Sequence, residues 1–261
     1  MEFIDIGANL TNRSLMKDID GVIARAADAG VRQIVVTGTS IDESSKAIEL
    51  CHQYPNQLVC TVGIHPHHAS EWMSDTQASL QNLSKNTCVR AIGETGLDFN
   101  RNYSPRDEQI DAFRRQLELA ISLNKPVFTH QRDAHDTFVE ILREYRDRLS
   151  KVVVHCFTDS KAALLHYLEL DCHIGITGWI CDERRGLELQ QLVGLIPADR
   201  LMVETDAPYL LPRDLPVKPS SRINEPAHLP HIVESIARHQ DKDIEQLTTE
   251  CLNTSQLFFN I

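Results

Sequence analysis

Eight short apolar runs, rich in β-branched residues, recur along the chain and alternate with amphipathic segments. The runs are residues 3–6, 32–38, 58–64, 89–94, 126–130, 151–155, 172–178 and 201–205. Each run is almost continuously apolar, which is typical of strands that are buried on both faces of a parallel sheet. This alternation constrains the fold more than any other feature, because it favours repeated strand–helix units.

The segments between the runs have the patterns of helices. Residues 20–30 carry apolar side chains at intervals of three and four and end in glycine, and residues 104–124 begin with Ser, Pro and acidic residues. Both patterns indicate helices. Similar patterns predict helices over 133–149 and 159–170, and two closing helices within 226–240 and 243–259.

Eight strand–helix units in 261 residues match the size of one (β/α)8 TIM-type barrel. We therefore predict a single domain, residues 1–261. A doubly wound parallel sheet is the alternative, since a sequence does not show whether a sheet closes.

Composition restricts the class of protein. Apolar residues make up 42% of the chain, enough for a sizeable core, and the seven irregularly spaced cysteines predict reduced thiols rather than a disulfide framework. The chain shows no transmembrane span and no signal-peptide pattern, so we expect a cytoplasmic monomer without membrane contact. The net charge of −11 does not attract nucleic acid by bulk electrostatics. A polyanionic substrate must then be held by local cations or bound metal.

Histidines and carboxylates stand where five of the predicted strands end. In a parallel barrel, active sites lie at the C-terminal ends of the strands. Imidazole and carboxylate groups are the usual donors for Zn²⁺ and Mn²⁺, and carboxylates also bind Mg²⁺. One such residue alone most often bonds to a loop or caps a helix, but five at corresponding positions predict a divalent metal site. The five residues are His65, Glu94, His130, His155 and Asp206.

Roles within this site follow from the donor chemistry. Glu94 is the natural bridging carboxylate if two ions bind, and His130 and His155 are the nitrogen ligands. Asp206 can act as ligand, as general base, or as both in turn.

The first predicted strand departs from a common pattern. Metal-dependent hydrolases built on such barrels usually contribute a His-x-His pair there, whereas this chain has Gly7 and Asn9. Asn9 offers a carbonyl oxygen or binds a water, and Gly7 offers no side chain. A site poorer in nitrogen favours Mg²⁺ or Mn²⁺ over Zn²⁺, and one or two ions remain open.

Cationic residues follow several predicted strands, and arginine suits bidentate contact with phosphate. TIM barrels often bind phosphate near the loops after strands 7 and 8. The alternative for each cation is a solvated surface position. The candidates are Arg132, Arg184, Arg185 and Arg213, with Lys218 and Arg222 in a later loop.

Other residues near the strand ends have more ordinary interpretations. Tyr103, Trp179 and Tyr209 could stack on bases, but aromatic residues at strand ends usually pack in the core. His67 and His68 are interpreted as loop residues, and Cys156 as a packing residue.

Five motifs carry a resemblance to a known family. The stretches "GIHPH", "IGETGLDF", "HQRDA", "HCFTD" and "ETDAPYLLPR" resemble those of the TatD family of metal-dependent deoxyribonucleases, which are amidohydrolase-like barrels. The resemblance covers nearly the whole chain. It implies hydrolysis of DNA phosphodiester bonds from the 3′ end, preferably in single strands, with possible RNA activity and a role in DNA repair or degradation. It also implies metal ligands at Glu94, His130, His155 and Asp206, and a phosphate contact at His65.

The predicted catalytic residues are therefore Asp206, Glu94 and His65, and the predicted substrate contacts are His65, Arg132, Arg184 and Arg213. Mg²⁺ is the expected cofactor, with Mn²⁺ or Zn²⁺ as alternatives. Two other functions stay open. The same site could cleave a small ester, amide or aminoacyl ester, or the protein could be a non-enzymatic partner linked to protein export. The retained ligand set argues against the second function.

Overall fold

The structure is a computed structural model that describes residues 1–217 and 219–261. All eight predicted strands form, and they are parallel and ordered as in the sequence, β1 to β8. The chain divides into two compact parts. Unit 1 comprises residues 1–36, 156–161 and 174–261, and unit 2 comprises residues 37–155 and 162–173.

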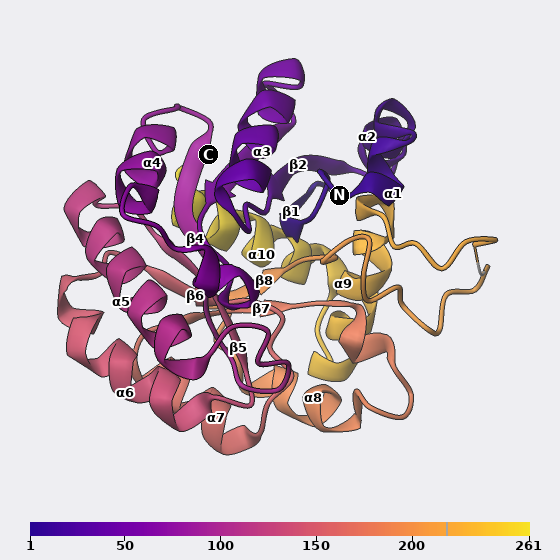
Figure 1. Cartoon of the computed structure of the whole chain (residues 1–261). Helices are drawn as coiled ribbons and strands as arrows, with labels where there is room; N and C mark the ends of the chain where they lie inside the picture. Colours follow the sequence, from indigo (N-terminus) through magenta and orange to yellow (C-terminus); the bar gives the residue numbers. More distant parts are fainter. Residues whose placement is uncertain (218) are drawn as a thin grey trace. The chain divides into compact units, whose positions relative to one another are not determined.

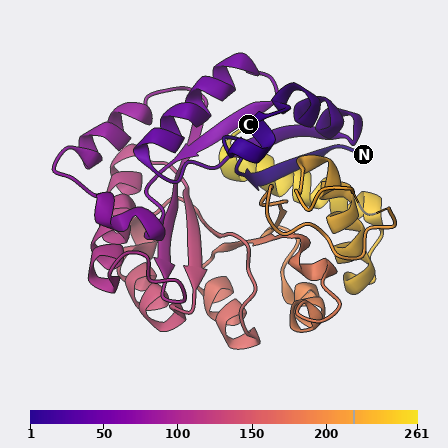
Figure 2. The same ribbon diagram turned by 45° about the vertical axis from the view of Figure 1, so that its right-hand side comes forward.

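Unit 2 contains four strands that pair in parallel in the order β3, β4, β5, β6. Figures 1 and 2 show α4, α5 and α6 side by side along one face of these strands. The strands are β3 (Leu58–Val62), β4 (Val89–Asp98), β5 (Val127–Arg132) and β6 (Val152–Val154). The helices are α3 (Ile41–Gln53), η1 (Pro66–Glu71), α4 (Thr76–Leu83), α5 (Arg106–Leu123), α6 (His135–Tyr145), η2 (Arg146–Arg148) and α7 (Lys161–Glu169).

The core of unit 2 lies between its strands and helices. All five residues of β3 are buried, and the rings of Phe113 in α5 and Phe138 in α6 stack with centroids 5.2 Å apart. Helix α5 follows Pro105, whose fixed φ suits a helix start, and ends at Asn124 in the left-handed conformation that closes many helices. The local sequence fixes where α5 begins and ends, and the packing of Phe113 on Phe138 holds it in place.

Unit 1 contains two parallel strand pairs, β1 with β2 and β7 with β8. Helix α10 packs on β1 and β8, and the Asp243 side chain caps its N-terminus by accepting from the amides of Glu245 and Gln246. The strands are β1 (Phe3–Ala8), β2 (Val31–Val36), β7 (His173–Ile176) and β8 (Leu201–Val203). The helices are α1 (Arg13–Met16), α2 (Ile19–Asp28), η3 (Gly178–Cys181), α8 (Leu187–Leu192), η4 (Val193–Leu195), η5 (Pro226–His228), α9 (Leu229–Gln240) and α10 (Ile244–Phe259).

The helices predicted from sequence are confirmed as α2, α5, α6, α7, α9 and α10. Three strands end later than predicted, because β1 continues to Ala8, β4 to Asp98 and β5 to Arg132. Glu94 and His130 therefore lie inside strands, since Gly96 pairs with His130 and continues the ladder. Lys218 lies outside the described residues. Over residues 1–217 and 219–261, every helix is too short or too polar to cross a bilayer.

Candidate metal centre

Three imidazole rings of unit 2 converge on one carboxylate oxygen. Oε1 of Glu94 lies 2.8 Å from Nε2 of His155, 3.0 Å from Nδ1 of His130 and 3.2 Å from Nε2 of His65. Glu94, His65 and His155 are buried, and His130 is partly buried. The structure thus brings together four of the five residues predicted from sequence, all within unit 2.

Two glycines allow β4 to approach β5 closely enough to form this cluster. Gly93 and Gly96 have φ angles of +145° and +140°, where side chains are rarely accepted. A Cβ atom on Gly96 would lie 1.9 Å from the carbonyl oxygen of His130, and one on Gly93 would lie 2.2 Å from that of Phe128. The backbone amide of Glu94 also donates to the carbonyl of Gly38 at 2.7 Å, which anchors the strand on its other side.

His65 has a defined hydrogen position. It caps η1, and its Nδ1 accepts the backbone amide hydrogen of His67 at 3.0 Å. Burial lowers the pKa of His65 to about 4, against the opposing effect of Glu94, so the ring is neutral near pH 7. A neutral ring that accepts at Nδ1 carries its hydrogen on Nε2. His65 is therefore a hydrogen-bond donor toward Glu94 rather than a lone-pair donor, which suits a phosphate contact.

The pKa values of Glu94 and His130 are shifted in opposite directions. Burial alone would raise the pKa of Glu94, but His155 and His65 outweigh it and hold that pKa well below its usual value. Burial alone would lower the pKa of His130, but Asp98 and Glu94 outweigh it and raise that pKa. The centre therefore holds an ionised carboxylate surrounded by imidazole rings.

Asp98 is part of the cluster and was missed by the sequence interpretation. Its Oδ2 lies 2.7 Å from Nε2 of His67 and 3.4 Å from Nε2 of His130. Its Oδ1 accepts from the amides of Asn100 and Arg101 at 3.0 and 2.8 Å. The sequence did contain a pattern that could have revealed Asp98. Glu94 and Asp98 are four residues apart, and residues at this spacing in one strand lie on the same face.

His67 was wrongly interpreted as a loop residue. It lies in η1, where its ring meets Asp98 and packs edge-on against His65 with centroids 4.3 Å apart. His68 also lies in η1, but it is partly exposed and pairs with Glu71.

The donor set of unit 2 suits a divalent cation. Among the described residues, Nε2 of His130 is buried without a hydrogen-bond partner, and two buried carboxylates lie around the same point. Imidazole nitrogen and carboxylate oxygen are ligands for Zn²⁺, Mn²⁺ and Mg²⁺. Nε2 of His130 makes no hydrogen bond to the residues that the structure describes, although the Asp98 carboxylate lies 3.4 Å away, and a bound ion would pair with it.

The remaining predicted ligand, Asp206, belongs to unit 1. It lies just after β8 with φ of +54°, and its amide donates to the carbonyl of Gly7 at 2.9 Å. The side-chain amide of Asn9 donates to Oδ1 of Asp206 at 3.0 Å. Asn9 therefore uses its nitrogen to orient Asp206, rather than offering a carbonyl oxygen to that carboxylate.

A buried acid supports the loop before Asp206. Asp5 of β1 is fully buried and accepts from the amide of Thr205 at 2.9 Å, from the Thr205 hydroxyl, and from the amide of Gly7. Burial raises the pKa of Asp5 to about 7, although these hydrogen bonds oppose the shift. The neighbouring Glu204 is also buried and accepts from the amide of Cys156.

The predicted arginine contacts differ in their surroundings. Arg132 is exposed at the end of β5, two residues after His130, and pairs in register with Asp98. Arg213 of unit 1 donates to both oxygens of Glu183 at 3.3 Å, and Nε of Arg184 lies 4.0 Å from the same carboxylate. Arg132 is thus the arginine beside the histidine cluster of unit 2.

Two aromatic residues expected in the core are exposed. Tyr103 is 67% exposed and Tyr209 is 53% exposed. The ring of Tyr103 meets the ring of His67 edge-on, with centroids 4.7 Å apart. Tyr103 therefore presents an open aromatic surface beside the cluster.

Comparison with known proteins identifies the family. The model of the "TatD related DNase" family matches residues 4–260. The chain belongs to the TatD family of DNases. One TatD relative, the "3′-5′ ssDNA/RNA exonuclease TatD" of Erwinia amylovora, is 51% identical over 97% of this chain and 98% of its own length. The relative of the same name from Escherichia coli K12 is 50% identical over the same shares.

Solved structures of TatD proteins confirm the predicted (β/α)8 fold. A TatD family hydrolase from Entamoeba histolytica has a TM-score of 0.90 at 27% identity, covering 99% of this chain and 98% of that one. The TatD homologue YjjV from Escherichia coli K12 also has a TM-score of 0.90, at 25% identity and the same coverage. The family resemblance inferred from the five motifs is therefore confirmed.

Proposed function

We propose that the protein is a divalent-metal-dependent exonuclease that degrades single-stranded DNA, and also RNA, from the 3′ end. The observation that carries this proposal is the convergence of three imidazole nitrogens within 3.2 Å of Oε1 of Glu94. Family membership supplies the reaction class, and relatives about half identical in sequence carry this activity in their names.

Glu94, His130 and His155 would hold the ion, with Asp206 as the further ligand predicted from sequence. When bound, a divalent ion would polarise the scissile phosphate and lower the pKa of the attacking water. We favour Mg²⁺, because His65 has the hydrogen-bond pattern of a donor and only two imidazoles remain as ligands in a set otherwise made of carboxylates. Mn²⁺ and Zn²⁺ are the alternatives.

The neighbouring residues are suited to hold a phosphate. The Nε2 hydrogen of His65 points into the cluster and can be donated to a non-bridging phosphate oxygen. Arg132, at the end of β5, supplies a positive charge and a planar pair of donors. Both residues would orient the scissile group and balance its charge, and Arg184 and Arg213 remain candidates for more distant phosphates.

Asp206 is the proposed general base. The hydrogen bond that its carboxylate accepts from the Asn9 side chain fixes the direction of that carboxylate. Glu94, held ionised by its histidine neighbours, is the second catalytic carboxylate.

We expect a long nucleic acid to make few contacts with the protein, which favours action at an end. With a net charge of −11 the protein does not attract a phosphate backbone in bulk, so binding relies on local groups. Tyr103 is suited to stack on a base next to the scissile phosphate, since its ring is exposed beside His67.

The test compares linear single-stranded DNA labelled at the 5′ or the 3′ end with covalently closed circular single-stranded DNA, in Mg²⁺ and in chelator. Release of labelled mononucleotide from the 3′ end, with an intact circle, is expected. His65→Ala should lose most of this activity. His68→Ala, which alters a partly exposed neighbour that pairs with Glu71, should retain it. Rapid cleavage of the circle would replace the exonuclease proposal with an endonuclease, and hydrolysis of an ester panel without nuclease activity would replace the substrate class.

A further inference from the structure

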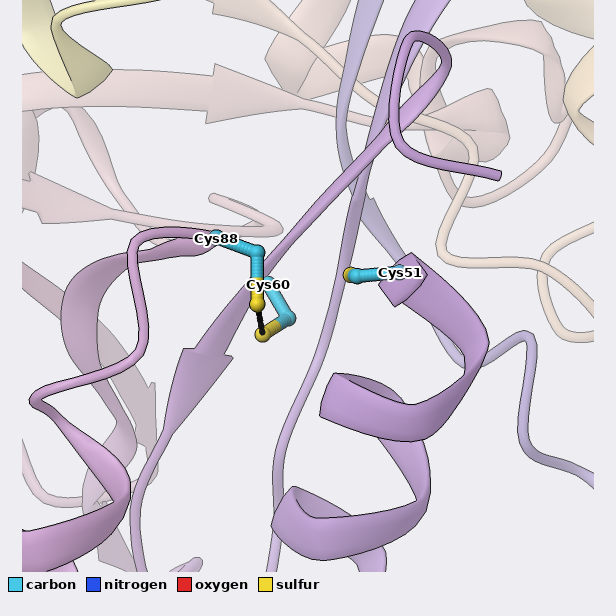
Figure 3. A group of neighbouring side chains, drawn as sticks. All are labelled: Cys51, Cys60 and Cys88. Carbon is cyan, nitrogen blue, oxygen red and sulfur yellow. Dashed lines mark hydrogen bonds between the residues drawn. The ribbon is translucent and has the colours of Figure 1, made fainter. Parts of the chain in front are cut away.

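A second group of potential ligands lies in unit 2, apart from the histidine cluster. Cys51 of α3, Cys60 of β3 and Cys88, which immediately precedes β4, point toward one another (Figure 3). Their sulfur atoms all lie within 4.8 Å of one another, and Sγ of Cys60 is 4.0 Å from Sγ of Cys88. Cys51 and Cys60 are fully buried and Cys88 is partly exposed. Three chain segments therefore meet at three thiols.

The sulfur separations match ligands that share one ion. A Zn–S bond of about 2.3 Å in a tetrahedral site places two sulfur ligands about 3.8 Å apart. A disulfide requires a sulfur separation of about 2.0 Å. The observed 4.0 Å between Cys60 and Cys88 is thus close to the first distance and twice the second.

A cationic side chain acts on two of the three cysteines. Lys125 is partly buried, interacts electrostatically with Cys60 and Cys88, and donates to the carbonyl of Val89 at 2.6 Å. Within the described part of the chain, Arg90, whose charge acts on Lys125, has a buried Nε without a hydrogen-bond partner. Three thiolates and Zn²⁺ would carry a net charge of −1, which these cations offset.

We propose that Cys51, Cys60 and Cys88 form a zinc site with three thiolate ligands and a water at the fourth position, open on the side of Cys88. The site is distinct from the histidine cluster. Cys88 and Glu94 are six residues apart along one extended segment, which corresponds to about 20 Å. Zinc bound there would join α3 to the middle of β3 and the start of β4 and stabilise unit 2, independently of the nuclease chemistry.

Cobalt titration of the full-length protein tests this proposal. Thiolate ligands give bound Co²⁺ an intense near-ultraviolet charge-transfer absorption that imidazole and carboxylate ligands do not give. One equivalent of Co²⁺ should produce this band, and Zn²⁺ should remove it. Cys88→Ser should lose the band, whereas Cys251→Ser, which alters a buried thiol of α10, should retain it. Glu94→Ala should also retain the band, which separates this site from the proposed nuclease centre.

Absence of the band in wild-type protein, or its persistence in Cys88→Ser, would overturn the zinc proposal. Circular dichroism should show that Cys88→Ser is folded, as expected for a partly exposed position that keeps a similar side-chain volume. If Cys88→Ser is not folded, Cys51→Ala, which removes the ligand from α3, replaces it in the titration and should also lose the band. A Cys60–Cys88 disulfide in protein that gives no band would assign the cluster to redox chemistry instead.

Discussion

Replacement of Asp5 by asparagine should remove a pH dependence that is built into unit 1. The Asp5 carboxyl group is fully buried and surrounded by the Thr205 amide and hydroxyl and the Gly7 amide. Burial raises its pKa to about 7 from the usual value of 3.8. An asparagine has the shape of the protonated acid, accepts the same two amide hydrogens through its oxygen, and can donate to the Thr205 hydroxyl.

The sign and size of the effect follow from linkage. Below about pH 4 the carboxyl is protonated in both folded and unfolded chains. Between pH 4 and pH 7 the unfolded chain ionises while the folded chain keeps its proton, so the free energy of unfolding falls as pH rises. The loss is about 1.4 kcal/mol for each pH unit, or about 4 kcal/mol in all, and it ends near pH 7. The asparagine side chain of the variant has no proton to lose.

Urea unfolding followed by circular dichroism from pH 5 to pH 9 measures this difference. The free energy of unfolding of Asp5→Asn minus that of wild type should rise by roughly 1.4 kcal/mol per pH unit up to pH 7 and then stay level. Asp28→Asn, which alters an exposed carboxylate of α2, should run parallel to wild type throughout. A parallel curve for Asp5→Asn would show that Asp5 is ionised in the folded protein and would refute the burial argument.

Three further outcomes are expected for residues that are predicted to take part in metal binding. Glu94→Gln should lower Mg²⁺-dependent nuclease activity by at least about a hundredfold with a circular dichroism spectrum like that of wild type, and near-full activity would exclude a ligand role. Gly7→His combined with Asn9→His should raise Zn²⁺ affinity at least about tenfold, because it adds two nitrogen donors to one strand face. Unchanged Zn²⁺ affinity by calorimetry in a folded double variant would contradict the prediction that these two positions face the metal. Asp98→Asn should lower the pKa of His130 in an NMR titration, because a carboxylate that favours the charged ring is removed, and an unchanged pKa would show that Asp98 does not act on it.

The fold and most of the unit 2 cluster follow from the sequence for a simple reason. Strand periodicity places His65, His130 and His155 at corresponding ends of neighbouring parallel strands, and side chains at such positions gather together. The local sequence pattern was sufficient to predict these three histidines, because each of them lies within three positions of a strand end. The assignment of Asp206 to the same chemistry rests on its motif and stays a prediction.

The parts that sequence did not predict depend on contacts across strands. The sequence interpretation ended this strand at Glu94, whereas Gly96 continues the ladder and is needed for close approach to the carbonyl of His130. That error truncated β4 and hid Asp98. The exposure of Tyr103 was also not predicted, because an aromatic residue near a strand end packs inward in most proteins. Only the folded backbone around it shows that this ring is exposed.

Asp98 divides its two oxygens between the histidine cluster and the loop that follows β4. One oxygen meets His67, while the other holds the amides of Asn100 and Arg101. A change in charge around the histidines therefore alters the strength of two backbone hydrogen bonds outside the cluster. The exchange rates and chemical shifts of these two amides give the protein a pair of native reporters, which can follow events in the cluster without a label placed inside it.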